Sequence, residues 1–304
     1  MKIMLAKHYG LCFGVKRAIK LAKMNARDNF GKKVFTLGPI IHNPQTVEFL
    51  KDKNNIIPLD DYNNIKNYNK SDILLVIRSH GIPKNFEEKL FNEGYKLIDA
   101  TCPFVKKAQN IAKDLKNRGI FSVIIGDKNH PEVIGIKSYA SSDAIIVNSI
   151  EELNDIYQKN IFNIQSKKIV GVLSQTTQNI TKLDEIVNFL QNKNIIVEKY
   201  NTICLSTLER QKDAKKIANI TDIVFVIGGK NSSNTNKLFE ICKKVNEKVF
   251  YLEEDKDIDE LFKSHKLTIQ DLLQSNIGLV TGASTSCLII RKIINKLRGI
   301  NSGR

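Results

Sequence analysis

The sequence predicts an α/β protein made of three similar lobes with parallel-type sheets, placed around a pseudo-threefold axis with a central cavity. Short apolar runs alternate with helical patterns, which is typical of parallel α/β units. Cys12, Cys102 and Cys204 each stand where a strand-like run ends and a helical pattern begins, 90 and 102 residues apart. Each cysteine is followed by two strands and two polar turns, so the repeat is one of architecture rather than of residue identity.

Length and composition agree with such a chain. Its 304 residues, 42% hydrophobic and 26% charged, are enough for two or three compact units with real cores. The longest apolar stretches have five residues, whereas a membrane-spanning helix needs about 20. Lys7 and His8 interrupt the first apolar patch before it reaches the length that a signal peptide requires. We therefore expect a cytoplasmic protein with no membrane partner.

The net charge of the chain indicates which kinds of molecule it can bind. Forty-seven basic residues against 32 acidic ones give a net charge of +15. The lysines are scattered, with no basic cluster among aromatic residues and no Trp, so the pattern does not favour nucleic-acid binding. A diffuse positive field suits an anionic substrate or an acidic electron-transfer partner.

The elements repeat in a fixed order along the chain. Each junction cysteine opens a helical pattern, and Pro103 suits a first helical position. The predicted strands are residues 34–38, 73–77, 122–126, 169–173, 223–229 and 277–280. The polar turns after them are residues 41–44, 78–81, 129–132, 174–177, 231–234 and 281–284. Ligands gather at the carboxyl ends of parallel strands, so we expect the turns and the three cysteines to converge on one cavity.

This order also predicts the lobe boundaries. The first lobe is residues 14–102, the second is residues 103–203, and the third is residues 204–298 together with residues 1–13, which close the ring. Residues 299–304 are expected to be a disordered tail.

The cysteines separate into two groups. Cys242 and Cys287 lie in apolar helical patterns and are expected to be small buried hydrophobic residues. The three junction cysteines lie at helix N-termini, where the positive end of the helix dipole favours the thiolate. Three thiolates without a local C-x-x-C pair can hold zinc, or a cubane iron–sulfur cluster whose fourth iron has no protein ligand.

The polar turns carry the residue types of an anion site. They hold three His, one Glu and several Ser, Thr and Asn at helix starts, where backbone N–H groups point at a bound phosphate. Gly228, Gly229 and Gly282 allow close approach of the backbone to a ligand.

Taken together, nine ordered motifs from residue 1 to about 298 resemble the family of 4-hydroxy-3-methylbut-2-enyl diphosphate reductases (LytB/IspH). They are Ala6-x-x-x-Gly10-Leu-Cys12-Phe-Gly-Val, Gly38-x-x-x-His42-Asn43, Ser79-His80-Gly81, Asp99-Ala-Thr-Cys102-Pro, His130-Pro-Glu-Val133-x-Gly135, Ser174-Gln-Thr-Thr177, Cys204, Lys230-Asn-Ser-Ser-Asn-x-Asn236 and Thr281-Gly-Ala-Ser284.

This resemblance implies an iron–sulfur oxidoreductase at the last step of the methylerythritol phosphate route of isoprene biosynthesis. Such an enzyme removes the allylic hydroxyl of its diphosphate substrate and gives isopentenyl and dimethylallyl diphosphate, with electrons from a ferredoxin or flavodoxin. It implies that a 4Fe-4S cluster with one open iron is held by three ligands, and that a catalytic group handles protons beside a diphosphate-binding set. The ligands are Cys12, Cys102 and Cys204, the catalytic residues are Glu132, Thr176 and His130, and the substrate-binding residues are His42, His80, His130, Thr176, Ser232, Ser233, Asn234 and Ser284.

One departure and two rival classes remain open at this point. Ser286 stands where the family usually has Pro, but Ser also caps helices well, so only the local loop geometry is in doubt. A non-redox enzyme with an open metal, such as a hydratase or a metal-dependent phosphate-ester enzyme, predicts activity without reductant. A binding module predicts binding that survives loss of all three junction cysteines.

Overall fold

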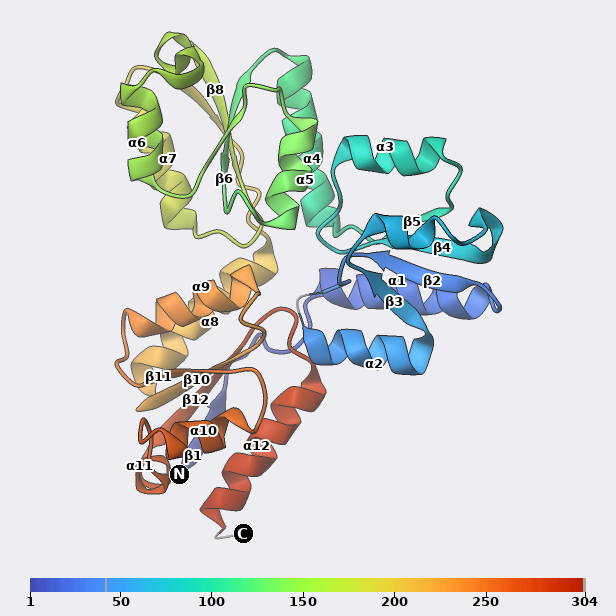
Figure 1. Cartoon of the computed structure of the whole chain (residues 1–304). Helices are drawn as coiled ribbons and strands as arrows, with labels where there is room; N and C mark the ends of the chain where they lie inside the picture. Colours follow the sequence, from blue (N-terminus) through green and yellow to red (C-terminus); the bar gives the residue numbers. More distant parts are fainter. Residues whose placement is uncertain (42, 303–304) are drawn as a thin grey trace. The chain divides into compact units, whose positions relative to one another are not determined.

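The computed structural model describes residues 1–41 and 43–302 (Figure 1). The chain divides into two compact units. The first unit consists of Met1–Lys16, Ile41–Glu48 and the chain from Leu205 onward, and the second consists of Arg17–Ile40 and Phe49–Cys204. Among the described residues, no helix is both long enough and apolar enough to span a bilayer.

The first unit contains one parallel sheet with the order β1-β12-β10-β11. A single row of partners, Leu5, Leu279, Phe225 and Phe250, crosses all four strands in register. The strands are β1 (Lys2–Leu5), β10 (Ile223–Ile227), β11 (Val249–Leu252) and β12 (Asn276–Thr281). The helices after Cys204 are α8 (Leu205–Ile220), α9 (Ser233–Lys243), α10 (Asp257–Lys263), α11 (Ile269–Gln274) and α12 (Cys287–Asn301).

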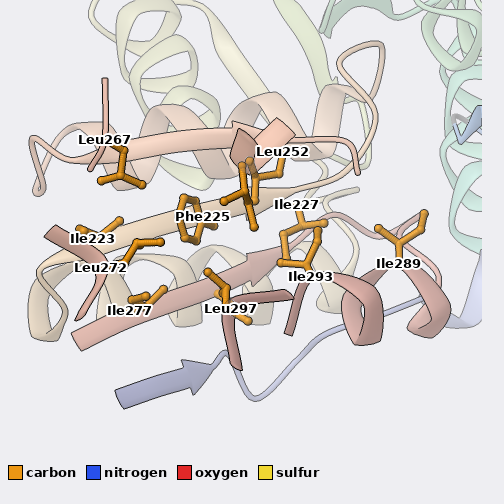
Figure 2. Close-up of a cluster of buried hydrophobic side chains, with 12 residues drawn as sticks. Ile223, Phe225, Ile227, Leu252, Leu267, Leu272, Ile277, Ile289, Ile293 and Leu297 are labelled. Atoms are coloured by element: carbon orange, nitrogen blue, oxygen red, sulfur yellow. The ribbon is translucent and has the colours of Figure 1, made fainter. Parts of the chain in front are cut away.

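Apolar cores cover both faces of this sheet. On one face, Ile289, Ile293 and Leu297 of α12 belong to one buried apolar cluster with Phe225 and Ile227 (Figure 2). These side chains recur at i, i+4 and i+8, the spacing of one helix face. A second buried cluster joins α8 and α9 to the other face of the strands. The central strands β10 and β12 are therefore buried on both faces, which is why they are continuous apolar runs.

The second unit contains two further parallel sheets, with the orders β3-β2-β4-β5 and β7-β6-β8-β9. In the second of these, α4 and α5 lie on one side of the strands and α6 and α7 on the other (Figure 1). The strands are β2 (Lys33–Leu37), β3 (Ile56–Leu59), β4 (Ile73–Ile77), β5 (Leu97–Asp99), β6 (Phe121–Ile125), β7 (Ile145–Val147), β8 (Ile169–Ser174) and β9 (Ile196–Lys199). The helices of the chain up to Cys204 are α1 (Phe13–Asp28), α2 (Pro44–Asn54), α3 (Lys84–Asn92), α4 (Pro103–Asn117), α5 (Pro131–Tyr139), α6 (Ile150–Gln158) and α7 (Ile180–Gln191), with 3-10 turns at Tyr62–Ile65, Lys70–Asp72 and Ile161–Ser166.

The α/β class and the parallel sheets predicted from the sequence are confirmed, but each sheet has four strands where the repeat indicated two. The two predicted strands are the central pair in the second unit, and β10 and β12 are the central pair in the first. The added strands lie at the sheet edges, have three or four residues, and are partly exposed. Such short, half-buried segments have no long apolar run to mark them.

Within the second unit, the two sheets are joined through their helices. Ser138 of α5 accepts a hydrogen bond from the Lys84 N–H at the start of α3 (2.9 Å), and the Tyr139 hydroxyl bonds the carboxylate of Glu87 (3.1 Å). Gly81, in the left-handed region with φ +73°, lies so close to Gln109 of α4 that a Cβ would come within 2.8 Å of its amide nitrogen. The polar turn after β4 is thereby pressed against α4.

The end of the chain differs from the sequence-based expectation. Helix α12 continues to Asn301, so residues 299–301, predicted as part of a disordered tail, are helical. The reason is that Ile300 packs against the apolar cluster under the sheet of the first unit. Residues 303–304 lie outside the described residues.

Candidate functional site

The three junction cysteines each stand immediately before a helix, and their backbones are tied to neighbouring strand ends. The N–H of Cys12 donates to the carbonyl of Ala283 (2.9 Å) in the first unit. In the second unit, the N–H of Cys102 donates to Ser79 (2.9 Å) and that of Cys204 to Thr176 (3.0 Å). All three are half-buried. None of the five cysteines, all of them described, is in a disulfide.

The donor set of these cysteines fits an iron–sulfur cluster. Thiolates are the ligands of such clusters, and Cys12, Cys102 and Cys204 precede α1, α4 and α8, whose N-terminal dipoles favour the thiolate. Over residues 1–41 and 43–302, no three His, Cys, Asp or Glu side chains are gathered in the arrangement of a metal site. Cys12 belongs to the first unit, and Cys102 and Cys204 to the second.

Glu132 is a buried carboxyl group at the start of α5, with an exposed fraction of 2%. One carboxylate oxygen accepts the backbone N–H of Thr176 at 2.6 Å, and the other accepts the Thr176 hydroxyl at 3.0 Å. Burial raises the pKa of Glu132 from 4.5 to about 7, although both hydrogen bonds from Thr176 lower it. The group can thus hold a proton near neutral pH and release it in a single step.

His130 caps the same helix and fixes its own tautomer. Its Nδ1 accepts the backbone N–H of Glu132 at 3.2 Å, so in the neutral ring the proton lies on Nε2. The His80 ring meets the His130 ring edge to face, with centroids 5.5 Å apart. The turn after β4 and the turn after β6 therefore bring two imidazoles together in the second unit.

A continuous chain of contacts joins the buried acid to one junction cysteine. Thr176 bonds Glu132 through its N–H and hydroxyl, and its carbonyl accepts the N–H of Cys204. Residues from the ends of β6, β8 and β9 are thus connected, as expected at the carboxyl edge of a parallel sheet. Every predicted site residue of the second unit lies at such an edge: His80, Cys102, His130, Glu132, Thr176 and Cys204.

In the first unit, the predicted anion-binding residues surround the start of α9. Ser232 is its N-cap and accepts the N–H of Thr235 at 3.3 Å. Asn234 is 4% exposed, and neither its side-chain oxygen nor its nitrogen has a hydrogen-bond partner within the described residues. An amide left in this state costs free energy unless a ligand pairs with it. Ser233 is the first residue of the helix, and Ser284 lies buried in the turn after β12.

Glycines bring this turn and the start of α9 into direct contact. A Cβ on Gly282 would lie 2.2 Å from the Thr235 hydroxyl oxygen, and one on Gly228 would lie 2.6 Å from the same atom. Only residues without a side chain allow the ends of β10 and β12 to approach Thr235 so closely. This supports an anion site where two strand ends and one helix N-terminus meet.

Arg210 is a functional candidate that no motif of the sequence indicates. It is 4% exposed, and its guanidinium donates to the carbonyls of His8 (3.1 Å), Gly10 (2.7 Å) and Thr281 (3.0 Å). The Gly10 N–H in turn donates to the Thr281 hydroxyl at 2.9 Å. Arg210 therefore holds the segment that leads to Cys12. The only signal in the sequence is an arginine on the apolar face of the α8 pattern.

Three other residues of the sequence-based prediction have different outcomes. Cys242 is fully buried, as expected, but the expectation for Cys287 is wrong because this residue is exposed. It is the first residue of α12, whose buried face starts at Ile289. His42 was predicted to bind substrate and lies outside the described residues.

Comparison with known proteins gives consistent relationships over almost the whole chain. The family model described as "LytB protein" matches residues 3–298. The 4-hydroxy-3-methylbut-2-enyl diphosphate reductase of Clostridium perfringens (strain 13 / Type A) is 40% identical over 297 residues, which is 97% of this chain and 98% of the relative.

Two solved structures are also similar. One, described as (E)-4-hydroxy-3-methyl-but-2-enyl diphosphate reductase, the terminal enzyme of the non-mevalonate pathway, has a TM-score of 0.67 and 36% identity and covers 98% of this chain and 99% of its own. The other, the E-1-hydroxy-2-methyl-but-2-enyl-4-diphosphate reductase from Plasmodium falciparum, has a TM-score of 0.80 and 28% identity and covers 97% and 87%. With the match of the family model over residues 3–298, these relationships establish that the chain belongs to the LytB protein family.

Proposed function

We propose that this chain is a 4-hydroxy-3-methylbut-2-enyl diphosphate reductase that acts in the cytoplasm at the last step of the non-mevalonate isoprenoid route. The allylic alcohol takes up two electrons and two protons, its C–O bond breaks, and isopentenyl or dimethylallyl diphosphate and one water leave. Family membership and 40% identity over nearly the full length support this activity. The observation that carries it in this chain is the contact chain from Glu132 through Thr176 to Cys204.

Cys12, Cys102 and Cys204 would hold the cluster, which we take to be a 4Fe-4S cluster with one iron that lacks a protein ligand. When bound, such a cluster supplies single electrons and a Lewis acid to the C–O bond. Each of the three sheets with its helices would form one lobe, with lobe boundaries near Cys102 and Cys204. The half-buried cysteines and their helix N-termini support this assignment.

Glu132 would deliver the proton that lets the hydroxyl leave as water. Its raised pKa, to about 7, keeps a large fraction protonated at neutral pH, and the two bonds from Thr176 hold both oxygens in place. A positioned acid of this kind contributes about 10²- to 10⁴-fold in rate. Burial of the group excludes the bulk water that would otherwise exchange the proton.

The diphosphate would be held by donors from several strand ends. The partnerless amide of buried Asn234, the N-terminus of α9 and the Nε2–H of His130 support this role. Diphosphate binding would fix the reacting carbon relative to Glu132. The complete proposed set is His42, His80, His130, Thr176, Ser232, Ser233, Asn234 and Ser284.

Two single electrons per turnover require a one-electron carrier, and we propose an acidic ferredoxin or flavodoxin for this role. The net charge of +15 supports the choice, because opposite charge steers association.

The test is turnover of 4-hydroxy-3-methylbut-2-enyl diphosphate with reduced methyl viologen, after anaerobic purification and cluster reconstitution. We expect dye oxidation that depends on substrate and yields both five-carbon diphosphates. Protein that carries an intact cluster but leaves the dye reduced would refute the reductase function. Activity without any reductant would instead support the non-redox alternative.

The ligand assignment has a matched control within the chain. We expect Cys204→Ser to reconstitute with little iron and sulfide, whereas Cys287→Ser, the same change at an exposed cysteine, should reconstitute like the parent. A full and stable complement of iron in Cys204→Ser would remove this residue from the ligands.

A further inference from the structure

A groove of about 560 Å³ opens on the second unit beside Cys102. Thr101 and Pro103, the two neighbours of Cys102 in the chain, both line it. The charged residues around the rest of the groove are Arg17, Asp99, Lys106, Lys107 and Asp114. The surface next to a proposed cluster ligand is therefore both concave and strongly charged.

The charges of this groove do not cancel. Lys106 pairs with Asp99 at 2.9 Å, and Asp114 lies 3.2 Å from Arg118, which it shares with Glu198 at 2.5 Å. Lys107 is exposed and has no ion-pair partner within the described chain. Three cations, Arg17, Lys106 and Lys107, line the groove against two carboxylates, Asp99 and Asp114, so its lining carries a net positive charge.

Arg17 completes the same surface from another element. Its guanidinium donates to the carbonyl of Thr101 at 3.0 Å, one residue from Cys102. The hydrogen bond holds the guanidinium at the groove. Because the carbonyl carries no net charge, it does not neutralise the positive charge of Arg17. The N-terminus of α4, which starts at Pro103, adds the positive end of a helix dipole.

We propose that the groove bounded by Arg17, Pro103, Lys106 and Lys107 is the docking surface for an acidic one-electron carrier protein, which delivers electrons beside Cys102. The proposal rests on the proposed function, because only a reductase needs such a carrier. Charge complementarity selects the occupant: a positive rim around a concave surface attracts a negatively charged partner and raises its association rate. Electron-transfer complexes are small and transient, so a groove of this size with a charged rim is sufficient.

The chain offers a matched pair of lysines for the test. Lys107 and Lys113 are both exposed on α4, and neither has an ion-pair partner in the part of the chain that the structure describes. Lys113 does not line the groove; six residues further on, it lies about 240° around the helix and about 9 Å along it. Lys107→Glu and Lys113→Glu change the net charge by the same amount and differ only in place.

Two readouts apply to the reconstituted protein. The first is the affinity for an oxidised acidic ferredoxin, measured by calorimetry without turnover; the second is the KM for the reduced ferredoxin at several salt concentrations. We expect Lys107→Glu to weaken affinity and raise KM by on the order of threefold to tenfold, with a shallower salt dependence. Lys113→Glu should stay close to the parent, and Lys107→Gln should fall between.

Reduced methyl viologen separates this proposal from the proposed function. The dye needs no docking surface, so Lys107→Glu should retain viologen-driven turnover while ferredoxin-driven turnover falls. Failure of viologen-driven turnover in the parent would instead refute the reductase function. Equal effects of Lys107→Glu and Lys113→Glu, or no effect of Lys107→Glu on ferredoxin affinity, would overturn the docking surface.

Discussion

Replacing Glu132 with glutamine removes a carboxyl group that folding transfers from water into the interior. The amide can keep both contacts, since its oxygen can accept the Thr176 N–H and its nitrogen can donate to the Thr176 hydroxyl. The change therefore isolates the free energy of the buried charge. We expect Glu132→Gln to stabilise the cluster-free protein against unfolding, and to do so more at high pH.

The magnitude follows from the pKa of Glu132, which burial raises from 4.5 to about 7. Each pKa unit corresponds to about 1.4 kcal/mol, so ionising the group in the native state costs about 3 kcal/mol. The native state holds the proton more tightly than the unfolded chain, so this contribution to stability is fully present below pH 4.5 and lost as pH rises through about 7. The loss is about 1 kcal/mol at pH 5 and about 3 kcal/mol at pH 8. A glutamine has no such loss.

The assay is urea unfolding of both proteins at pH 5 and pH 8, followed by circular dichroism, with comparison of midpoints at unchanged m values. The unfolding free energy of the variant minus that of the parent should grow by about 2 kcal/mol between pH 5 and pH 8. Glu185→Gln, at an exposed carboxylate on α7, is the control and should show no such growth. An advantage that does not change with pH, or a variant less stable than the parent at pH 8, would refute the reasoning.

Three further predictions concern neighbours of the site. Thr176→Val removes a hydrogen bond that lowers the pKa of Glu132. When kcat is measured against pH, its decline on the alkaline side should therefore move to higher pH; a decline at the same pH as in the parent would contradict this. Asn234→Leu should leave the unfolding free energy unchanged or raise it by about 1 kcal/mol, because the buried amide has no partner within the described residues. It should nevertheless reduce the increase in Tm that inorganic diphosphate causes. An increase in Tm as large as that of the parent would exclude the amide from the anion site. Arg210→Met leaves three carbonyls without their donor, so unfolding free energy should fall by about 2 kcal/mol or more and iron per chain should drop; normal iron content would show that Cys12 does not depend on this arginine.

The central strands could be predicted from the sequence because burial on both faces requires continuous apolar runs. Residues 73–77 and 223–227 are fully buried along their whole length. The edge strands could not be predicted, because their burial is partial and their length is only three or four residues; β3 even contains Pro58, which edge positions tolerate. Local pattern thus identifies the middle of each sheet and misses its edges.

The candidate site, like the fold, could be predicted from the sequence only in part. The residue types at the polar turns were readable, because helix starts have a recognisable composition. The contact between Glu132 and Thr176 was not, because 44 residues separate them in the chain. Arg210 was missed for a similar reason: its partners lie at His8, Gly10 and Thr281, and no short window contains them. Cys287 was misread because one apolar run does not tell which helix face is buried.

The pairing of β1 with β12 sets the order in which this protein can mature. Lys2 lies beside Asn276, and Leu5 beside Leu279, so β1 has no such partner until the roughly 270 residues that follow it have been made. Pairing over such a distance is slow, because the loop between the partners must close first. The Cys12 segment follows β1 directly and is fixed by Arg210 and Thr281. Loading of the proposed cluster at Cys12 would therefore follow translation of β12, and a chain stopped before β12 would expose an unpaired strand to aggregation.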